Sequence, residues 1–172
     1  VLEAENSVIT KYRNTHRFFI AIGYSNLNAT RELIFERIKK LGCKMTSFVS
    51  ADAKIHNSSI GENCLILEQN NIQPFSRIED NVVLWSGNHI GHHSVIEKNV
   101  FVSSHVVIGG HCVVGKNSFL GVNATIGNQV RIGQANLIGA SALITEDTED
   151  NSCYFENQSK KSLVPSGRVR LR

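Results

Sequence analysis

Residues Ile108–Gly139 read IGGHCVVGKNSFLGVNATIGNQVRIGQANLIG, and a branched aliphatic residue returns in them at every sixth position. The same spacing extends toward the N-terminus and a little toward the C-terminus. It covers fifteen consecutive positions: Ile60, Ile66, Ile72, Ile78, Leu84, Ile90, Ile96, Val102, Ile108, Val114, Leu120, Ile126, Ile132, Ile138 and Ile144. A period of six is neither the period of an α-helix nor the alternation of a strand. It is the hexapeptide signature of a parallel β-helix.

The other positions of each hexad agree with this interpretation. Glycine often follows the aliphatic residue, as at Gly91, and a small or β-branched residue often stands four positions after it, as at Cys112. Two inward positions four residues apart suit a short strand and a tight turn. Three such sides close a triangular coil, so residues eighteen apart stack on adjacent rungs, about 4.8 Å apart. The sequence predicts a mainly β fold with about five coils.

A second regularity has the length of one coil. Asparagines recur every eighteen residues, at Asn63, Asn81, Asn99 and Asn117. Asparagine tolerates the left-handed backbone conformation and is common in turns. We therefore expect a ladder of asparagines along one corner of the prism. An ordinary β-sandwich would require no fixed register of this kind.

The periodicity divides the chain into three parts. Residues 1–48 lack the hexad and are predicted to form a small, partial α/β domain. Residues 49–148 form the β-helix, and residues 149–172 form a polar, then basic, C-terminal tail.

The first part contains signals for a strand, a turn and a helix. Arg17–Ile22 predicts a buried strand and Gly23 a turn. Asn28 is a plausible N-cap. A helix with one apolar face follows, and Gly42 is expected to end it.

Composition limits the classes of function. The 172 residues carry a net charge of +3, which weakly favours an anionic ligand and does not by itself indicate nucleic acid. No apolar run is long enough for a membrane span. Four cysteines without a CxxC pair suggest reduced thiols and a cytoplasmic protein, and no structural zinc is expected from them.

The densest group of chemically active residues is Ser86–Ser94, SGNHIGHHS. His89, His92 and His93 surround the inward Ile90 and should therefore face outward or lie at a corner. The eighteen-residue repeat stacks Gly110 on His92. A base and a backbone N–H would then lie together, as acyl transfer requires.

Other uses of these histidines remain open. They can simply cap turns, and the chain can be a non-catalytic trimeric scaffold. A zinc site would combine His89 or His92 with His105 and His111, as in a hydratase similar to γ-carbonic anhydrase. Because His105 and His111 belong to different corner columns, this set gives no clear three-ligand geometry within one chain, and a site would need ligands from two subunits. We expect no metal.

With these motifs, the chain resembles the hexapeptide-repeat acyltransferases. Phe19–Tyr24 (FIAIGY), Arg31 and Ser50–Ile55 (SADAKI) resemble the branch with bacterial sialic-acid O-acetyltransferases and nucleotide-sugar N-acetyltransferases. The resemblance implies a left-handed β-helix, a homotrimer and acetyl-CoA as co-substrate in the groove between adjacent prisms. Trp85, expected to face outward, would lie in the trimer contact or under the small domain.

The resemblance also implies roles for individual residues. His92 stands at the position of the family's general base, and His93 replaces the acidic residue that usually orients it. Gly110 matches the backbone donor to the thioester carbonyl. Val122 and Ala140 match positions that line the cofactor.

Gly23, Tyr24 and His89 are the candidate substrate-binding residues, although the glycine-rich nucleotide-binding turn of the family is missing. The resemblance implies an acetyl-CoA-dependent acetyltransferase acting on a nucleotide-activated amino sugar in bacterial surface-glycan (lipopolysaccharide or capsule) synthesis. The alternative within enzymes is O-acetylation of a free or polymer-bound sugar such as sialic acid.

Overall fold

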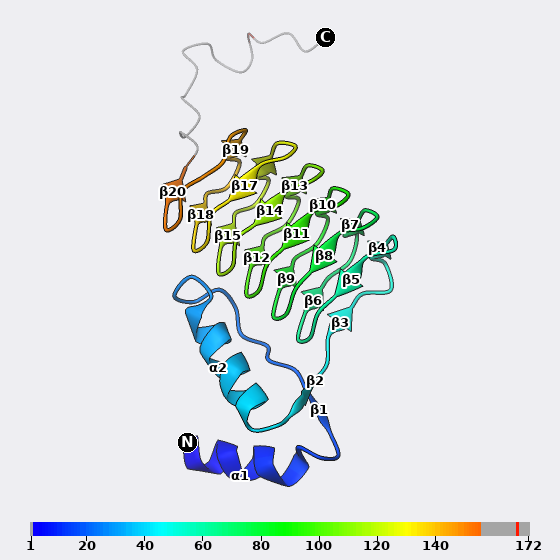
Figure 1. Ribbon diagram of the computed structural model, residues 1–172, viewed down its shortest axis with the longest axis vertical. Helices are drawn as coiled ribbons and strands as arrows, with labels where there is room; N and C mark the ends of the chain where they lie inside the picture. The colour runs from blue at the N-terminus through cyan, green and yellow to red at the C-terminus, as the bar shows by residue number, and fades with distance from the viewer. Residues whose placement is uncertain (1, 156–167, 169–172) are drawn as a thin grey trace.

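A computed structural model describes residues 2–155 and residue 168, with side chains from residue 7 onward. It consists of a stack of triangular coils and a small N-terminal part with two helices (Figure 1). The expected fold class, a parallel β-helix of hexapeptide repeats preceded by a small α/β part, is confirmed.

The coils contribute strands of two residues each to three parallel sheets. The seven-stranded sheet contains β3 (Phe48–Val49), β6 (Leu65–Ile66), β9 (Val83–Leu84), β12 (Phe101–Val102), β15 (Phe119–Leu120), β18 (Leu137–Ile138) and β20 (Cys153–Tyr154). The six-stranded sheet contains β4 (Lys54–Ile55), β7 (Asn71–Ile72), β10 (His89–Ile90), β13 (Val107–Ile108), β16 (Thr125–Ile126) and β19 (Leu143–Ile144). The five-stranded sheet contains β5 (Ser59–Ile60), β8 (Arg77–Ile78), β11 (Val95–Ile96), β14 (Val113–Val114) and β17 (Arg131–Ile132).

The pairing register is the one that the repeat predicts. Ile90 pairs with Ile72 on one side and with Ile108 on the other, so the rungs are eighteen residues apart. The stack is longer than the expected five coils, because the three sheets have seven, six and five strands. One reason is β20, which pairs with β18 although the hexad period stops after Ile144.

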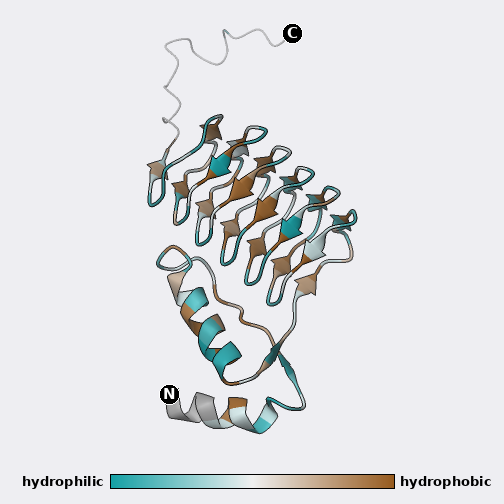
Figure 2. Ribbon diagram, viewed as in Figure 1, coloured by the Kyte–Doolittle hydropathy of each residue, from teal (hydrophilic) through white to brown (hydrophobic). Residues whose placement is uncertain are grey.

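The inward aliphatic side chains form the core of the prism. From Ile66 to Ile138 each of them is at most 1% exposed, whereas Ile60 at the first rungs is only partly buried. Figure 2 shows these strands as a mostly apolar stack. Burial raises the pKa of the Cys64 thiol to about 11 and also raises that of Cys112. Both cysteines therefore pack in the core as neutral thiols, as expected.

The asparagine ladder is present along one corner. Each side-chain amide donates to the next side-chain oxygen: Asn63 to Asn81 at 2.7 Å, Asn81 to Asn99 at 2.8 Å and Asn99 to Asn117 at 3.0 Å. All four residues have φ between 54° and 64°, in the left-handed region that asparagine tolerates. The ladder fixes the rotation of successive coils at this corner.

The N-terminal part contains α1 (Leu2–Tyr12), β1 (Arg17–Phe18), α2 (Ala29–Lys40) and β2 (Lys44–Met45). The strand expected over Arg17–Ile22 is only two residues long, because its single partner β2 has two residues. The helix α1 was not expected from the sequence. Among the side chains of α1 that the structure describes, only Ile9 packs on the small core. The helix therefore has no strong apolar pattern from which it could be predicted.

The helix α2 begins and ends near the predicted residues. Gly42, with φ of 75°, follows the C-cap as expected. Asn28 occupies the N-cap position but does not cap the helix. Its amide instead donates to the carbonyls of Asn117 and Ser118 at 3.0 and 3.1 Å, so it ties α2 to the β-helix.

Arg31 makes a second connection between α2 and the coils. Its side chain is 1% exposed and donates to the carbonyls of Asn81 at 3.2 Å and Asn99 at 2.6 Å. Burial lowers the pKa of the Arg31 guanidinium to about 10, so it is still charged at neutral pH. The turn carbonyls beside the asparagine ladder therefore hold a buried cation from the small domain.

Candidate active site and histidine cluster

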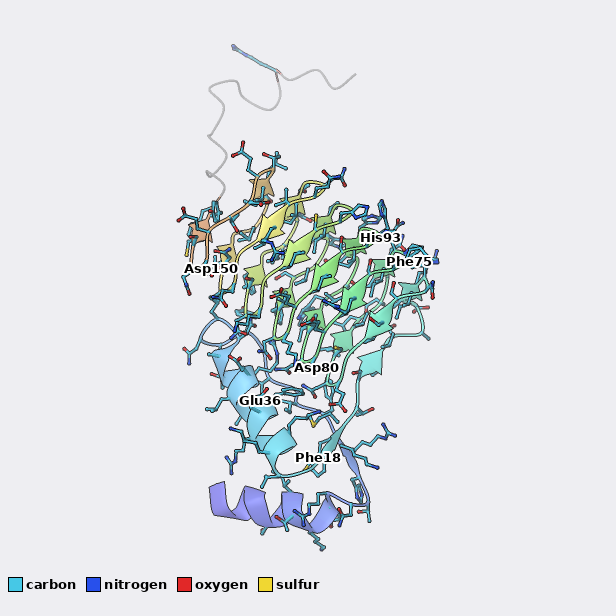
Figure 3. The ribbon with its side chains drawn as sticks, in the orientation of Figure 1. Phe18, Glu36, Phe75, Asp80, His93 and Asp150 are labelled. Atoms are coloured by element: carbon cyan, nitrogen blue, oxygen red, sulfur yellow. The ribbon has the colours of Figure 1, made fainter. Side chains whose placement is uncertain are left out.

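Three histidines gather at the corner that follows the six-stranded sheet. His92 and His93 follow β10, and His111 follows β13 on the next rung. The His111 N–H donates to the His92 carbonyl at 2.8 Å, which holds the two turns in register. All three residues are exposed. Figure 3 shows His93 beside Phe75, far from Phe18 and Glu36 of the N-terminal part.

The expected base and its neighbour are in contact. His92 Nδ1 lies 3.1 Å from His93 Nδ1, a hydrogen-bond distance in which one ring donates and the other accepts. The other ring nitrogen of His92 faces Gly110. A Cβ added at Gly110 would lie only 2.8 Å from His92 Nε2, so any side chain there would push the imidazole away.

The expected oxyanion donor is already engaged. The Gly110 N–H donates to Asn128 Oδ1 at 2.8 Å, so it is not free to bind a thioester carbonyl in this structure. Asn128 lies eighteen residues after Gly110, so the repeat places the two residues on adjacent rungs, but the spacing does not show where the Asn128 side chain points. Asn128 is thus a residue of the site that the histidine pattern alone did not indicate.

The expected cofactor-lining residues Val122 and Ala140 lie at the opposite edge of the six-stranded sheet from Gly110, where its strands begin. Gly110 follows β13, whereas Val122 precedes β16, and both strands belong to the six-stranded sheet. Val122 is 44% exposed, and Ala140, stacked on the same column, is also exposed. Within one chain, Gly110 therefore lies at one corner of the prism and Val122 with Ala140 at another.

The candidate substrate-binding residues are separated in the same way. Tyr24 packs on Phe101 and Phe119, with ring centroids 5.0 and 4.9 Å apart, and it shares a surface groove with Val122. His89 instead lies half-buried in β10, next to the histidine corner.

A second feature near Tyr24 is an apolar pocket of about 230 Å³ between the N-terminal segment and the coils. Gly23 lines it, and the Gly23 carbonyl accepts from Arg31 Nη1 at 3.3 Å. Trp85 and Phe101 form its β-helix wall. Trp85 thus faces the small domain across this pocket and is still 45% exposed, so its two expected positions, under the small domain and in a trimer contact, both remain open.

The weighed set with His105 does not converge, as expected, but the structure brings together a different set of three histidines within one chain. Ligand nitrogens of His92, His93 and His111 all lie within 4.8 Å of one another. His92 and His93 share a turn, and His111 stacks on His93. His105 is indeed elsewhere, because its ring packs over Gly87.

Comparison with known proteins agrees with the repeat. The model of the bacterial transferase hexapeptide family (six repeats) matches residues 75–110, which include His92, His93 and Gly110. The chain contains hexapeptide repeats, and this family model matches one stretch of them. No curated protein sequence matches it significantly.

Solved structures with the same fold as this hexapeptide-repeat protein include several acetyltransferases. A mutant of perosamine N-acetyltransferase from Caulobacter crescentus, in complex with CoA and GDP-perosamine, is 21% identical with a TM-score of 0.80, covering 86% of this chain and 70% of that chain. The acetyltransferase domain of PglB from Neisseria gonorrhoeae FA1090 is 22% identical with a TM-score of 0.79, covering 86% and 72%.

WeeI from Acinetobacter baumannii AYE is 20% identical with a TM-score of 0.69, and the match covers 91% of this chain and 75% of that chain. At these identities the likeness establishes the fold alone. The left-handed coil that the sequence led us to expect is consistent with this fold. Within the described residues of the repeat protein, no helix has the length and apolar character needed to cross a bilayer.

Proposed function

We propose that this repeat protein is an acetyl-CoA-dependent acetyltransferase that acts on a nucleotide-activated amino sugar in bacterial surface-glycan synthesis, in the cytoplasm. The observation that carries the proposal is the position of His92. Its Nε2 faces Gly110 at an exposed corner, and its Nδ1 contacts His93. Two solved structures of the same fold hold CoA and GDP-perosamine, which supports the substrate classes.

In one of its two donor–acceptor arrangements, the contact with His93 gives His92 a tautomer suited to a general base. When His92 donates from Nδ1 to His93 Nδ1, its Nε2 carries a lone pair toward Gly110. The sugar nitrogen then forms a bond to the thioester carbonyl carbon while Nε2 accepts the nitrogen's proton. Collapse of the tetrahedral adduct breaks the carbon–sulfur bond, and CoA leaves as the thiolate, which takes up that proton.

Stabilisation of the oxyanion requires a change at Asn128. The Gly110 N–H is the donor in the proposal, but in this structure it donates to Asn128 Oδ1. The acetyl carbonyl therefore has to displace the Asn128 side chain from this N–H. A donor that is aimed at the developing negative charge contributes most in the transition state.

The distribution of the other candidate residues favours a site between subunits. His92 and Gly110 lie at one corner of the prism, whereas Tyr24 and Val122 lie at another. A closed homotrimer can place the first corner of one copy against the second corner of the next. CoA would then contact Gly110 of one subunit and Val122 and Ala140 of its neighbour, with the sugar near His89 and the neighbour's Tyr24.

The experiment is an assay of CoA release from acetyl-CoA with UDP-, dTDP-, GDP- and CMP-linked amino sugars as acceptors, compared with the corresponding hydroxy sugars. Turnover with one amino sugar, lost in His92→Ala, supports the proposal. Turnover only with hydroxyl acceptors would replace it with O-acetylation. A wild-type protein that binds no acetyl-CoA in a thermal-shift assay would favour the scaffold instead.

A further inference from the structure

The histidine corner holds one residue that no step of the proposed reaction uses. His111 stacks on His93, with ring centroids 4.8 Å apart and planes 13° apart. Phe75 packs on His93 at 4.9 Å, so His93 has aromatic neighbours on both sides. His92 stands at 89° to His111, with centroids 5.0 Å apart. Within the described part of the chain, no hydrogen-bond partner is found for the His111 ring.

The spacing of the ring nitrogens matches the size of a metal site. They lie within 4.8 Å of one another, and the shortest pair, the Nδ1 atoms of His92 and His93, is 3.1 Å apart. A tetrahedral zinc ion with bonds of about 2.0–2.1 Å holds its ligand nitrogens about 3.3–3.4 Å apart. Because the His93 and His111 rings are stacked almost parallel, at least one of these exposed rings must turn out of the stack before both lone pairs can point at one ion. The two turns have the same backbone form, with φ of 58° at His93 and His111, and the hydrogen bond from the His111 N–H to the His92 carbonyl holds them in register.

We propose that His92, His93 and His111 form a site for Zn²⁺ or a similar divalent transition metal ion, with water as the fourth ligand. The ion inhibits the enzyme because it occupies the general base. The effect on catalysis rests on the proposed function, whereas the binding of the ion does not. Imidazole nitrogen favours zinc, copper and nickel, and oxygen-rich sites favour magnesium and calcium.

The inhibition follows from the valence of the imidazole ring. A neutral imidazole has one lone pair available for a metal or a proton, and its other nitrogen carries hydrogen. A metal ion on His92 Nδ1 therefore forces the hydrogen onto Nε2, which then faces Gly110 as a donor. A metal ion on Nε2 occupies the lone pair directly. In either case His92 cannot accept the proton of the sugar nitrogen.

Binding is measured on tag-free, EDTA-treated protein. Co²⁺ is followed by its visible absorption and Zn²⁺ by calorimetry, with Mg²⁺ as the negative probe. We expect one ion per chain. His111→Asn should lower the affinity for the ion by at least about tenfold, since losing even a residue that only hydrogen-bonds to a metal ligand reduces affinity by that factor. His105→Asn is the matched control, because His105 is also an exposed corner histidine with φ of 59°.

Activity provides the second readout. Zn²⁺ should inhibit the wild type and His105→Asn, and EDTA should reverse the inhibition. His111→Asn should keep the basal activity and resist Zn²⁺. Equal metal affinity in the wild type and His111→Asn, or no ion bound by the wild type, would overturn the site. If the protein transfers no acetyl group at all, the proposed function fails, but the Co²⁺ titration still decides the metal site.

Discussion

Asn117 donates a hydrogen bond from its side-chain amide to the carboxylate of Glu32 in α2. This contact ends a directional chain that starts where the Ile20 N–H donates to Asn63 Oδ1 at 2.8 Å. The asparagine ladder lies between these two ends, so the chain of donors leaves the small domain, crosses four coils and returns to it. Successive hydrogen bonds polarise one another, and a buried gap in such a chain leaves polar groups without partners.

The hydrogen bonds of the ladder should therefore add stability to the fold, in addition to the stability that comes from asparagine's tolerance of the left-handed turn conformation. We expect Asn81→Ala to lower the free energy of unfolding by about 1–3 kcal/mol more than Asn123→Ala, because it leaves buried partners unsatisfied. Asn123 is a matched control, since its φ of 60° is close to the 61° of Asn81 but it is exposed. Urea denaturation measures both values. Equal losses would mean that the ladder contributes only turn conformation.

The inward register has an equally direct test in two adjacent residues. Ile108 is fully buried, whereas Val107 in the same strand is 44% exposed. Ile108→Asp should prevent folding, because an unpaired charge would lie in a narrow apolar core. Val107→Asp should fold with a circular dichroism spectrum like that of the wild type. A well-folded Ile108→Asp protein would contradict the register.

The space at Gly110 is expected to control the position of His92. A Cβ at Gly110 would meet the His92 ring, whereas a Cβ at Gly127 would have no neighbour closer than 3.5 Å. Gly110→Ala should thus reduce kcat by about tenfold or more, since displacing a base impairs proton transfer. Gly127→Ala should keep activity, and thermal melting should show that both variants fold. Normal turnover of Gly110→Ala would show that the corner with His92 and Gly110 does not take part in the reaction.

The fold was predictable from the sequence because each rung repeats one local requirement. Inward positions such as Ile90 need an aliphatic side chain, and the corner with Asn99 needs a residue that tolerates a left-handed backbone. The strand β20 and the helix α1 carry no such repeated signal. β20 follows the irregular residues 145–152, and α1 buries little apolar surface.

The site was predictable only in part. The eighteen-residue spacing placed Gly110 next to His92, but it did not reveal that Asn128 occupies the Gly110 N–H. The convergence of His92, His93 and His111 depends on how two neighbouring turns point their rings, which spacing does not determine. Arg31 belongs to the motif that resembles the acetyltransferase branch, yet its burial on turn carbonyls depends on the docking of α2.

A site shared between subunits can be tested by complementation. His92→Ala and Val122→Arg should each be inactive as homotrimers, since one lacks the base and the other blocks the cofactor path. Unfolding and refolding them together in equal amounts should restore roughly a quarter of wild-type activity, because random closed trimers pair an intact His92 with an intact neighbouring Val122 at that frequency. No recovery in mixed trimers would indicate that both residues act within one chain.

The most direct test of the central claim, that His92 is the general base, is the pH dependence of turnover for the wild type and His92→Ala with an amine acceptor. At pH 6–7 the variant should be slower by about 10²–10⁴, the usual contribution of a positioned base. The difference should shrink as pH rises, because the acceptor amine then loses its proton to solvent before it attacks. Equal turnover of both proteins from pH 6 to 9 would contradict the account and leave His92 without a role in the reaction.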